Sequence, residues 1–385
     1  MEEIHNKDGD RVLSLLKSLQ KASKDLQNNP IFTMNKTQFS VEPFSDIDKD
    51  ANTILSGNPR LIKLSQLLCD LKSLLEKLQR HQGYSLSSIL QRQIINYKIC
   101  QVAYAVDAEI QAYIDRESVE NLVNILEESD EEDEKVRVLV DFEKRLSGGF
   151  DLGFQEWVLK AKVFSILEAF LCDATCSMKV RNQAALAIAA LIRFNKDVFV
   201  GLVLMGPTVR ALISMASACS IQVVSLLIKT IRIPLVDELE TYKEITRIIS
   251  LLSSENASIQ VAAFDCILGI AYYGRKEAIE NMLRVGLIKK LVDLQRSEHG
   301  DNFPEKIPEE EEEEEEDEDR YVEKYPFAGC VARFAVQVEV GEMLSEKEKM
   351  EFKLEILRMV REVSVSEAES TTIAAEVLWG SSPWN

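Results

Sequence analysis

Few residues in this chain combine the types and spacings that an enzyme active site needs. The three histidines, His5, His81 and His299, are far apart in the sequence, and none stands beside a plausible nucleophile. The chain contains no GxGxxG, GxxxxGK[ST], HExxH or GxSxG motif. A Gly-rich run at 148–153 follows a predicted helix at 142–146, whereas a phosphate-binding loop follows a strand. We therefore expect no catalytic residues and a protein that is not an enzyme.

The cysteines do not form a metal or redox motif. The closest pair, Cys172 and Cys176, does not have the CxxC spacing, and no second Cys/His pair follows it. The others are scattered, mostly inside apolar runs, as reduced and buried cysteines are in cytosolic or nuclear proteins: Cys69, Cys100, Cys219, Cys266 and Cys330. We expect no metal, no cofactor and a cytoplasmic location. The nucleus stays open, although the chain lacks a basic nuclear-localisation cluster.

Composition narrows the class of protein. The chain has 385 residues, with 45 Lys and Arg against 64 Asp and Glu, and a formal net charge of −19. Fifteen Gly and nine Pro are few for an all-β protein, which needs frequent turns, so helices are favoured. A strongly acidic chain repels phosphates, which argues against nucleic-acid partners. The start of the chain has no signal-peptide pattern, and serines interrupt the longest uncharged run, 211–228, so no membrane span is expected.

The N-terminal part reads as helices separated by a linker. Val12, Leu15, Leu16 and Leu19 share one face of a helix within 1–28, and Pro and Gly residues break the pattern over 29–58. A leucine heptad runs from Leu61 to Leu78, followed by an amphipathic helix at about 85–114. The heptad is shorter than most coiled-coil dimers, so an intramolecular bundle is the simpler interpretation. We predict a short helix plus flexible linker at 1–59 and a helical bundle at 60–116.

After the bundle the chain repeats itself. The runs that begin at Ser177, Ser220 and Ser258 resemble one another, and their spacing of about 40 residues with helical patterns is typical of armadillo or HEAT repeats. A second marker, Gly206 and Gly286, precedes a short apolar helix. One unit cannot bury its apolar face alone, whereas stacked units form a continuous core. We predict repeats over 117–300, with more repeats and a cap at 323–385 in which Trp379 covers the last core layer.

Several segments resemble a plant armadillo-repeat family. They are 286–294, 325–337 and 374–382, and the resemblance covers roughly 85–385. It implies an all-α armadillo-type α-solenoid, wound as a right-handed superhelix, behind the N-terminal bundle. The family's repeats are similar to those of plant U-box ubiquitin ligases and vacuole-associated armadillo proteins. The U-box core Cys-Pro-Ile does not occur here, which argues against ligase activity. The Trp/Asn ladder of importin-type proteins is also missing, since Ala161 stands four residues after Trp157.

Two acidic segments interrupt the helical pattern. Residues 309–319 are eleven consecutive Asp or Glu residues, which repel one another, so 301–322 is predicted to be a disordered insertion. The insertion is a solubilising loop in the simplest interpretation; it could also be a docking strip for a basic partner or a mimic that covers a basic groove. The other segment, 127–134, contains Ser129 followed by acids, as in casein-kinase-type sites, which makes Ser129 a phosphorylation candidate.

These features predict a non-enzymatic scaffold or adaptor. Its partner would be a protein of unknown identity, extended or helical, bound along the concave face of the solenoid, and the pattern indicates no oligomeric state. The alternatives are a substrate adaptor or regulator of ubiquitin ligation and a binder of basic proteins through the acidic tract. Candidate partner-binding residues are polar residues on exposed faces of the helices that follow the repeat glycines, together with matching positions upstream: Arg210, Ser214, Lys289, Lys290, Asp293, Asn121 and Asn124.

Overall fold

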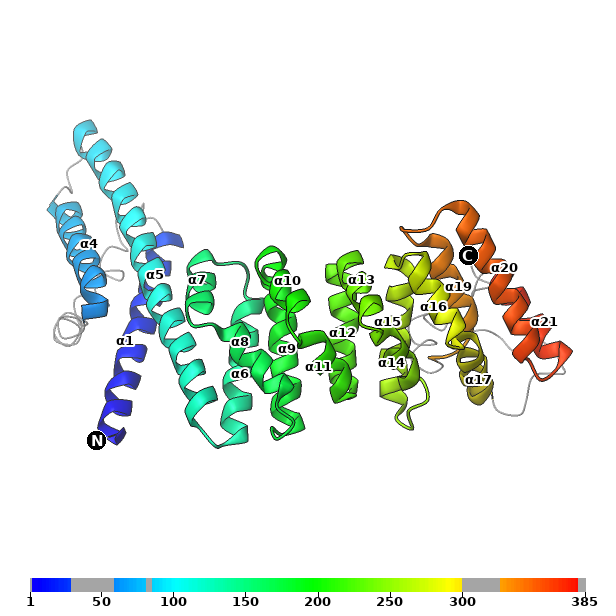
Figure 1. Ribbon diagram of the computed structural model, residues 1–385. Helices are drawn as coiled ribbons and strands as arrows, with labels where there is room; N and C mark the ends of the chain where they lie inside the picture. The colour runs from blue at the N-terminus through cyan, green and yellow to red at the C-terminus, as the bar shows by residue number, and fades with distance from the viewer. Residues whose placement is uncertain (1, 29–58, 81–84, 300–325, 380–385) are drawn as a thin grey trace, which may run out of the picture. The chain divides into compact units, whose positions relative to one another are not determined.

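The computed structural model describes residues 2–28, 59–80, 85–299 and 326–379 (Figure 1). The regular elements in these ranges are all helices. They form two units, one made of residues 1–124 and 151–161 and the other of residues 125–150 and 162–385. The predicted linker at 29–58 and the acidic run at 309–319 lie outside the described residues. The predicted all-α solenoid with an N-terminal helical bundle is confirmed by the helices described below.

The first unit is a bundle built around three helices. Its elements are α1 (Glu2–Asn28), η1 (Pro59–Leu61), α4 (Ile62–Arg80), most of α5 (Leu86–Glu128) and α7 (Leu152–Lys160). The leucine heptad of α4 packs inside the unit in two clusters, as the intramolecular interpretation predicted. Leu61 and Leu64 meet Leu16 and Leu19 of α1. Further along, leucines of α4 pack with Leu26 of α1 and with Ile99 and Ala103 of α5.

Two features of this unit differ from the sequence analysis. The first helix, which we placed outside the bundle, supplies part of its core, and the Ser23 hydroxyl donates to the Ala103 carbonyl at 2.6 Å. The boundary predicted between 116 and 117 does not interrupt the chain, because α5 continues to Glu128. Leu122 and Leu126 extend the buried face that Val106, Ile110 and Val119 begin. Residues 117–128, which we assigned to the beginning of the repeats, therefore belong to the same helix.

The second unit is a stack of three-helix repeats. A complete repeat consists of a long, a medium and a short helix. The first is α9 (Met178–Phe194), α10 (Lys196–Met205) and α11 (Thr208–Met215), and the second is α12 (Ala218–Ile231), α13 (Ile233–Thr241) and α14 (Glu244–Leu251). The third is α15 (Ala257–Tyr273), α16 (Lys276–Arg284) and α17 (Leu287–His299), and its third helix is longer than those of the other two. The long helices begin at residues 178, 218 and 257, so each repeat spans about 40 residues, the period of armadillo repeats. Before them lie α6 (Glu132–Ser147) and α8 (Val163–Cys172).

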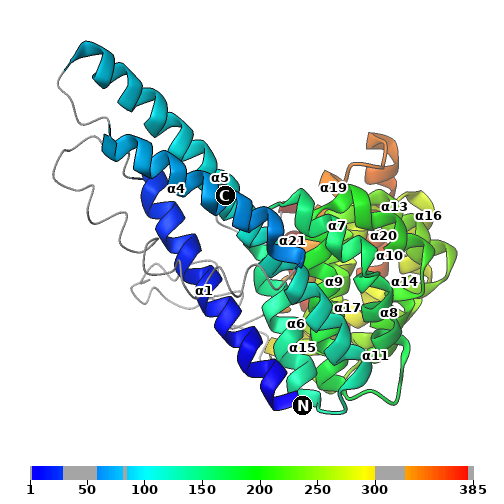
Figure 2. The same ribbon diagram turned by 90° about the vertical axis from the view of Figure 1, so that its left-hand side faces the viewer.

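Equivalent helices of successive repeats pack side by side. The long helices form one column in the order α6, α9, α12, α15 and α19 (Cys330–Val340), and the medium helices α10, α13 and α16 form another. The short helices α8, α11 and α14 form a third, which α17 continues through the contact of Lys290 with Ser253 after α14, and Figure 2 shows the columns end on. Ile188, Ile228 and Ile267 of the long column are fully buried. Leu212 of α11 and Ile248 of α14 are fully buried too, and this burial stabilises helices that are too short to persist alone in water.

The turns before three of the four short helices use a left-handed backbone conformation. Gly286, before α17, has a positive φ of 83°, as the repeat marker predicted. Lys162 and Lys243 take the same left-handed conformation before α8 and α14, with φ of 52° and 59°. Gly206, before α11, is extended instead, and a Cβ there would lie 2.8 Å from the Leu202 carbonyl oxygen. The equivalent turn is thus made by a left-handed glycine, by a left-handed lysine or by an extended glycine.

No single described helix is long and apolar enough to cross a membrane. The pair α10 and α11 reaches that length and composition together, with a bend of 71° between them.

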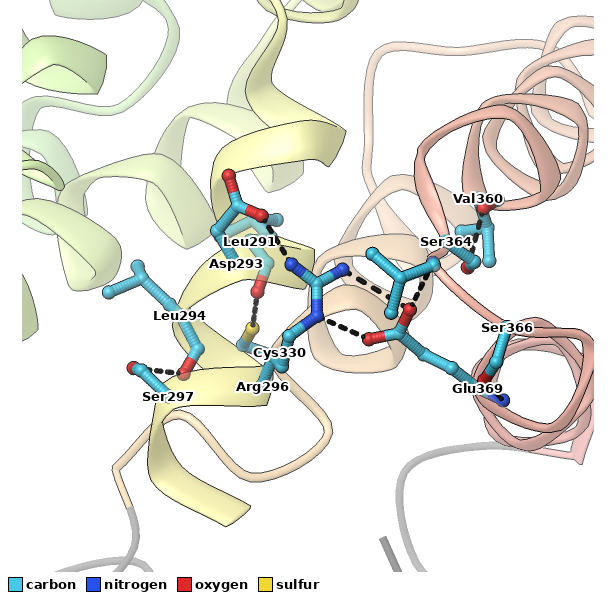
Figure 3. Close-up of polar contacts among 11 residues, drawn as sticks. Leu291, Asp293, Leu294, Arg296, Ser297, Cys330, Val360, Ser364, Ser366 and Glu369 are labelled. Atoms are coloured by element: carbon cyan, nitrogen blue, oxygen red, sulfur yellow. Dashed lines mark hydrogen bonds and ion pairs between the residues drawn. The ribbon is translucent and has the colours of Figure 1, made fainter. Parts of the chain in front are cut away.

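The C-terminal helices are held to α17 by an ion pair. α19 is followed by α20 (Glu346–Val363) and α21 (Glu367–Trp379). Arg296 of α17 donates two hydrogen bonds to the Glu369 carboxylate of α21, at 2.8 and 3.2 Å (Figure 3). Glu369 is fully buried and also accepts the Val365 N–H at 2.7 Å. Trp379, which we predicted to cap the core, is instead 82% exposed, so this pair and the core residues Ile373 and Val377 hold α21.

Replacing Glu369 by Ala should lower the free energy of unfolding by about 3 kcal/mol, because Arg296 would lose its buried partner. Burial alone raises the pKa of Glu369, but the hydrogen bonds from Arg296 and Val365 outweigh it and hold that pKa below 4.5. The contribution is therefore complete above pH 4.5 and is lost as the pH falls through the lowered folded-state pKa. Urea denaturation at pH 7 and pH 3 should show the difference between wild type and variant shrinking in acid.

The control for this prediction is Glu255→Ala, which changes an exposed turn residue and should alter stability by less than about 0.5 kcal/mol. Equal effects of the two substitutions, or a loss at Glu369 that does not depend on pH, would contradict the role assigned to the ion pair.

Candidate protein-binding surface

The predicted residues of the solenoid lie on two helices of the short column. Arg210 and Ser214 are exposed on α11, and Lys289 and Asp293 are exposed on α17, where Lys290 is half-buried. Between these two helices in the column lies α14, from which the sequence analysis selected no residue. α14 and the residues beside it supply the contacts that join the two predicted groups.

Contacts across α11 and α14 fix the first part of the surface. The Arg247 guanidinium of α14 donates to the Ser214 hydroxyl at 3.0 Å, and that hydroxyl donates to the Arg210 carbonyl at 2.7 Å. The Arg210 guanidinium lies 4.9 Å from the centroid of the Tyr242 ring, a cation–π distance. Arg247 also donates to both carboxylate oxygens of Glu244, at 2.9 and 3.2 Å. Glu244 is only 5% exposed, so its charge is matched within the protein rather than offered to a partner.

The contacts continue from α14 to α17. The Lys290 ammonium donates to the Ser253 hydroxyl, which lies just after the end of α14. Asp293 accepts from Arg296 on its own helix at 2.8 Å, and Arg296 is the residue that binds Glu369 (Figure 3). Asp293 therefore belongs to an internal ion-pair group, although its side chain is 51% exposed. This position reads better as part of the C-terminal attachment than as a partner contact.

The exposed residues of this column carry a charge opposite to that of the whole chain. Residues 208–215, 243–251 and 287–297 contain six Lys or Arg residues and two Asp or Glu residues, whereas the chain has 45 of the former and 64 of the latter. Both acids, Glu244 and Asp293, are paired with arginines of the same helices. We call five of the six cations, together with Ser214, the cationic row: Arg210, Ser214, Lys243, Arg247, Lys289 and Lys290.

The sequence analysis missed Tyr242, Lys243 and Arg247. The glycine marker that identified α11 and α17 is absent before α14, where Lys243 takes its place in the left-handed turn. A weaker signal was available, because Arg247 and Lys290 each occupy the fourth position of their short helices. Aligning those helices by their apolar positions alone would have found α14.

The upstream predicted residues are placed differently. Asn121 and Asn124 are exposed on α5 and belong to the first unit, whereas the cationic row belongs to the second. Ser129 is half-buried just before α6, where its hydroxyl donates to the Glu134 carboxylate at 2.7 Å and accepts the Glu131 N–H at 3.1 Å. Phosphorylation of Ser129 stays a prediction, and it would replace the bond to Glu134 by repulsion between like charges.

The described side chains do not assemble a site for metal or thiol chemistry. Among them, no group of three His, Cys, Asp or Glu residues could hold a metal ion. Cys266 and Cys330 are buried, but Cys69 and Cys172 are exposed, which corrects the prediction that the cysteines are mostly buried. The pKa of Cys172 is raised mainly by desolvation and further by the charge of Glu168. The pKa of Cys176 is raised mainly by desolvation and further by the hydrogen bond to Asp173. Thiols with raised pKa values are poor nucleophiles.

Comparisons with known proteins find similar chains among solved structures alone. No protein-family model matches the chain, and no curated protein matches it. Among solved structures it is similar to a designed armadillo repeat protein, at 18% identity over 68% of this chain and 98% of that one, with a TM-score of 0.44. Another design, solved with a (KR)4 peptide, has 18% identity, coverages of 68% and 97% and a TM-score of 0.43. An engineered protein matches 94% of this chain and 77% of its own length, at 17% identity and a TM-score of 0.45.

Arg247 should matter more for stability than Arg210, although both are exposed. Replacing Arg247 by Met leaves the buried Glu244 carboxylate without its arginine and should cost about 1–3 kcal/mol. Replacing Arg210 by Met removes only a surface cation–π contact and should cost less than about 1 kcal/mol. Urea denaturation followed by circular dichroism measures both. Adding Glu244→Gln to the Arg247 variant should recover part of the loss; no recovery would contradict the pairing.

Proposed function

We propose that this chain is a non-enzymatic protein-binding scaffold, and that the cationic row holds an extended acidic segment of a partner protein. The observation that carries the proposal is the reversal of charge on one helix column of a strongly acidic protein. Lys243 and Lys289 have no acidic partner among the described residues, and they repeat along the solenoid at successive short helices. An acidic segment would supply the missing counter-charges one repeat at a time.

The geometry of the column indicates the spacing of acids in that segment. Packed helices lie roughly 8–10 Å apart, and an extended chain advances about 3.3 Å per residue. Successive short helices therefore correspond to about three residues of an extended partner. A segment with an acid at every third residue would place one carboxylate near Arg210, the next near Arg247 or Lys243, and the next near Lys289 and Lys290.

The fixed side chains of the row favour such a partner. Ser214 and Ser253 hold Arg247 and Lys290 by hydrogen bonds, and the Tyr242 ring holds Arg210. Ordering these long side chains before binding reduces the conformational entropy lost on binding. Guanidinium groups are also suited to two-point contact with carboxylates. Roles as a substrate adaptor in ubiquitin ligation, or as a binder of basic proteins through 309–319, stay alternatives that rest on the sequence.

Binding of a labelled ten-residue peptide with glutamate at every third position tests the proposal. Full-length protein should bind it more tightly than it binds a peptide of the same composition with its glutamates consecutive, or one with lysines in place of glutamates. Reversing the charges of Arg210, Lys289 and Lys290 to Glu should weaken binding at least tenfold, measured by fluorescence anisotropy at two salt concentrations.

The matched control reverses three exposed cations away from the row, with the substitutions Lys144→Glu, Lys347→Glu and Arg361→Glu. It changes the net charge by the same amount and should leave binding within about twofold. Unchanged binding after reversal of the row would remove the row as the binding surface. An equal loss in both variants would show that the peptide responds to net charge alone.

A further inference from the structure

The N-terminal half of α5 carries a stripe of large side chains that the bundle leaves exposed. Leu90, Ile94, Tyr97 and Tyr104 are 61%, 56%, 65% and 62% exposed. Gln101 and Ala108 are also exposed and continue the same line. We call these six residues the α5 seam: Leu90, Ile94, Tyr97, Gln101, Tyr104 and Ala108. Leu86, one turn earlier, is 81% exposed and extends the apolar surface.

The spacing of the seam is that of a coiled coil. Its residues follow one another at intervals of four, three, four, three and four. Such a regular alternation keeps the stripe facing a second helix over its whole length, which an ordinary amphipathic pattern does not. The buried face of α5 is a separate stripe, formed by Ile99, Ala103, Val106 and Ile110 in the bundle core. α5 therefore presents two apolar faces, and the described residues of the first unit bury only one.

We propose that a second copy of this chain covers the α5 seam, so that two copies of α5 form a short coiled coil. The core positions fit this occupant. Ile94 stands at an a position and Leu90 at a d position, the combination that favours two-stranded assembly. Gln101 is a single polar residue at an a position, where a polar side chain meets its own counterpart and sets the register.

The residues that flank the seam favour a second copy over a foreign helix. Coiled coils select different partners through complementary charges at the flanking positions. Here those positions hold Gln91, Gln93, Lys98, Cys100, Ala105 and Asp107, and the Asp107 carboxylate already lies 3.9 Å from the Lys24 ammonium of α1. With so few flanking charges, the seam has no charge pattern that would select a charged partner, and no like charges that would repel a second copy of itself.

The area is sufficient for a weak dimer. Tyr97 and Tyr104 each present on the order of 150 Å². Together with the exposed parts of the leucines and Ile94, two seams would bury on the order of 1,200 Å², the lower end for specific interfaces. The polar tips of the tyrosines and the amide of Gln101 limit the affinity further. A micromolar dimer that dissociates on dilution is therefore expected.

Sedimentation equilibrium of the full-length chain over a hundredfold range of concentration tests the proposal. The chain should pass from monomer to dimer in the micromolar range. Ile94→Glu should raise the dissociation constant at least tenfold, because each copy would place a charge in the seam. Gln101→Leu should lower it about tenfold, because it removes the polar side chain from the seam. The second variant gains affinity, so a folding defect cannot imitate its effect.

The matched control is Met350→Glu on α20, which charges another apolar side chain of similar exposure, 60%, and should not change the dissociation constant. A chain that stays monomeric at every concentration, or a dimer that is indifferent to both seam substitutions, would overturn the proposal. A monomer in which Tyr97 and Tyr104 resist chemical modification would overturn it too, because the seam would then be covered by another segment of the same chain.

Discussion

The fold depends on one constraint, which is that no repeat can bury its own apolar face. The short helices of the second unit have eight to ten residues apart from α17, and helices of this length do not persist alone in water. Each becomes stable only when its apolar face packs against its neighbours, where Leu212 of α11 and Ile248 of α14 are fully buried. The side chains left outside these contacts are consequently set out in rows, one set for each repeat, and the cationic row is one such set.

This dependence explains which parts of the fold could be predicted. Apolar periodicity and the 40-residue spacing report the burial itself, so the solenoid and the intramolecular leucine heptad followed directly from the sequence. The turns were harder, because the left-handed conformation is common for glycine and uncommon for other residues. Gly286 predicted its turn from the sequence, but Lys162 and Lys243 adopt the same left-handed conformation because tertiary packing requires it. No local pattern marks a lysine for that role, and α14 was missed for this reason.

Only part of the candidate surface could be predicted from the sequence, for the same reason. The marker found Arg210, Ser214, Lys289 and Lys290, which are the two ends of the row. Arg247, which donates to Ser214 and neutralises Glu244 on the helix between them, required the structure. Asp293, also predicted from its exposure on α17, accepts a hydrogen bond from Arg296, the partner of Glu369. Exposure and position in a repeat select candidates, whereas hydrogen-bond partners decide which of them are already engaged.

Charge and apolar exposure divide the two proposed surfaces by the kind of partner that each can hold. The cationic row is polar and held by hydrogen bonds, so its affinity would come from charge and would weaken in salt. The α5 seam is apolar with few charges, so salt would leave its affinity largely unchanged. The two surfaces lie in different units of the chain. A dimer formed through α5 would carry two cationic rows, and a partner with two acidic segments would then gain avidity whenever a linker allowed both rows to be occupied.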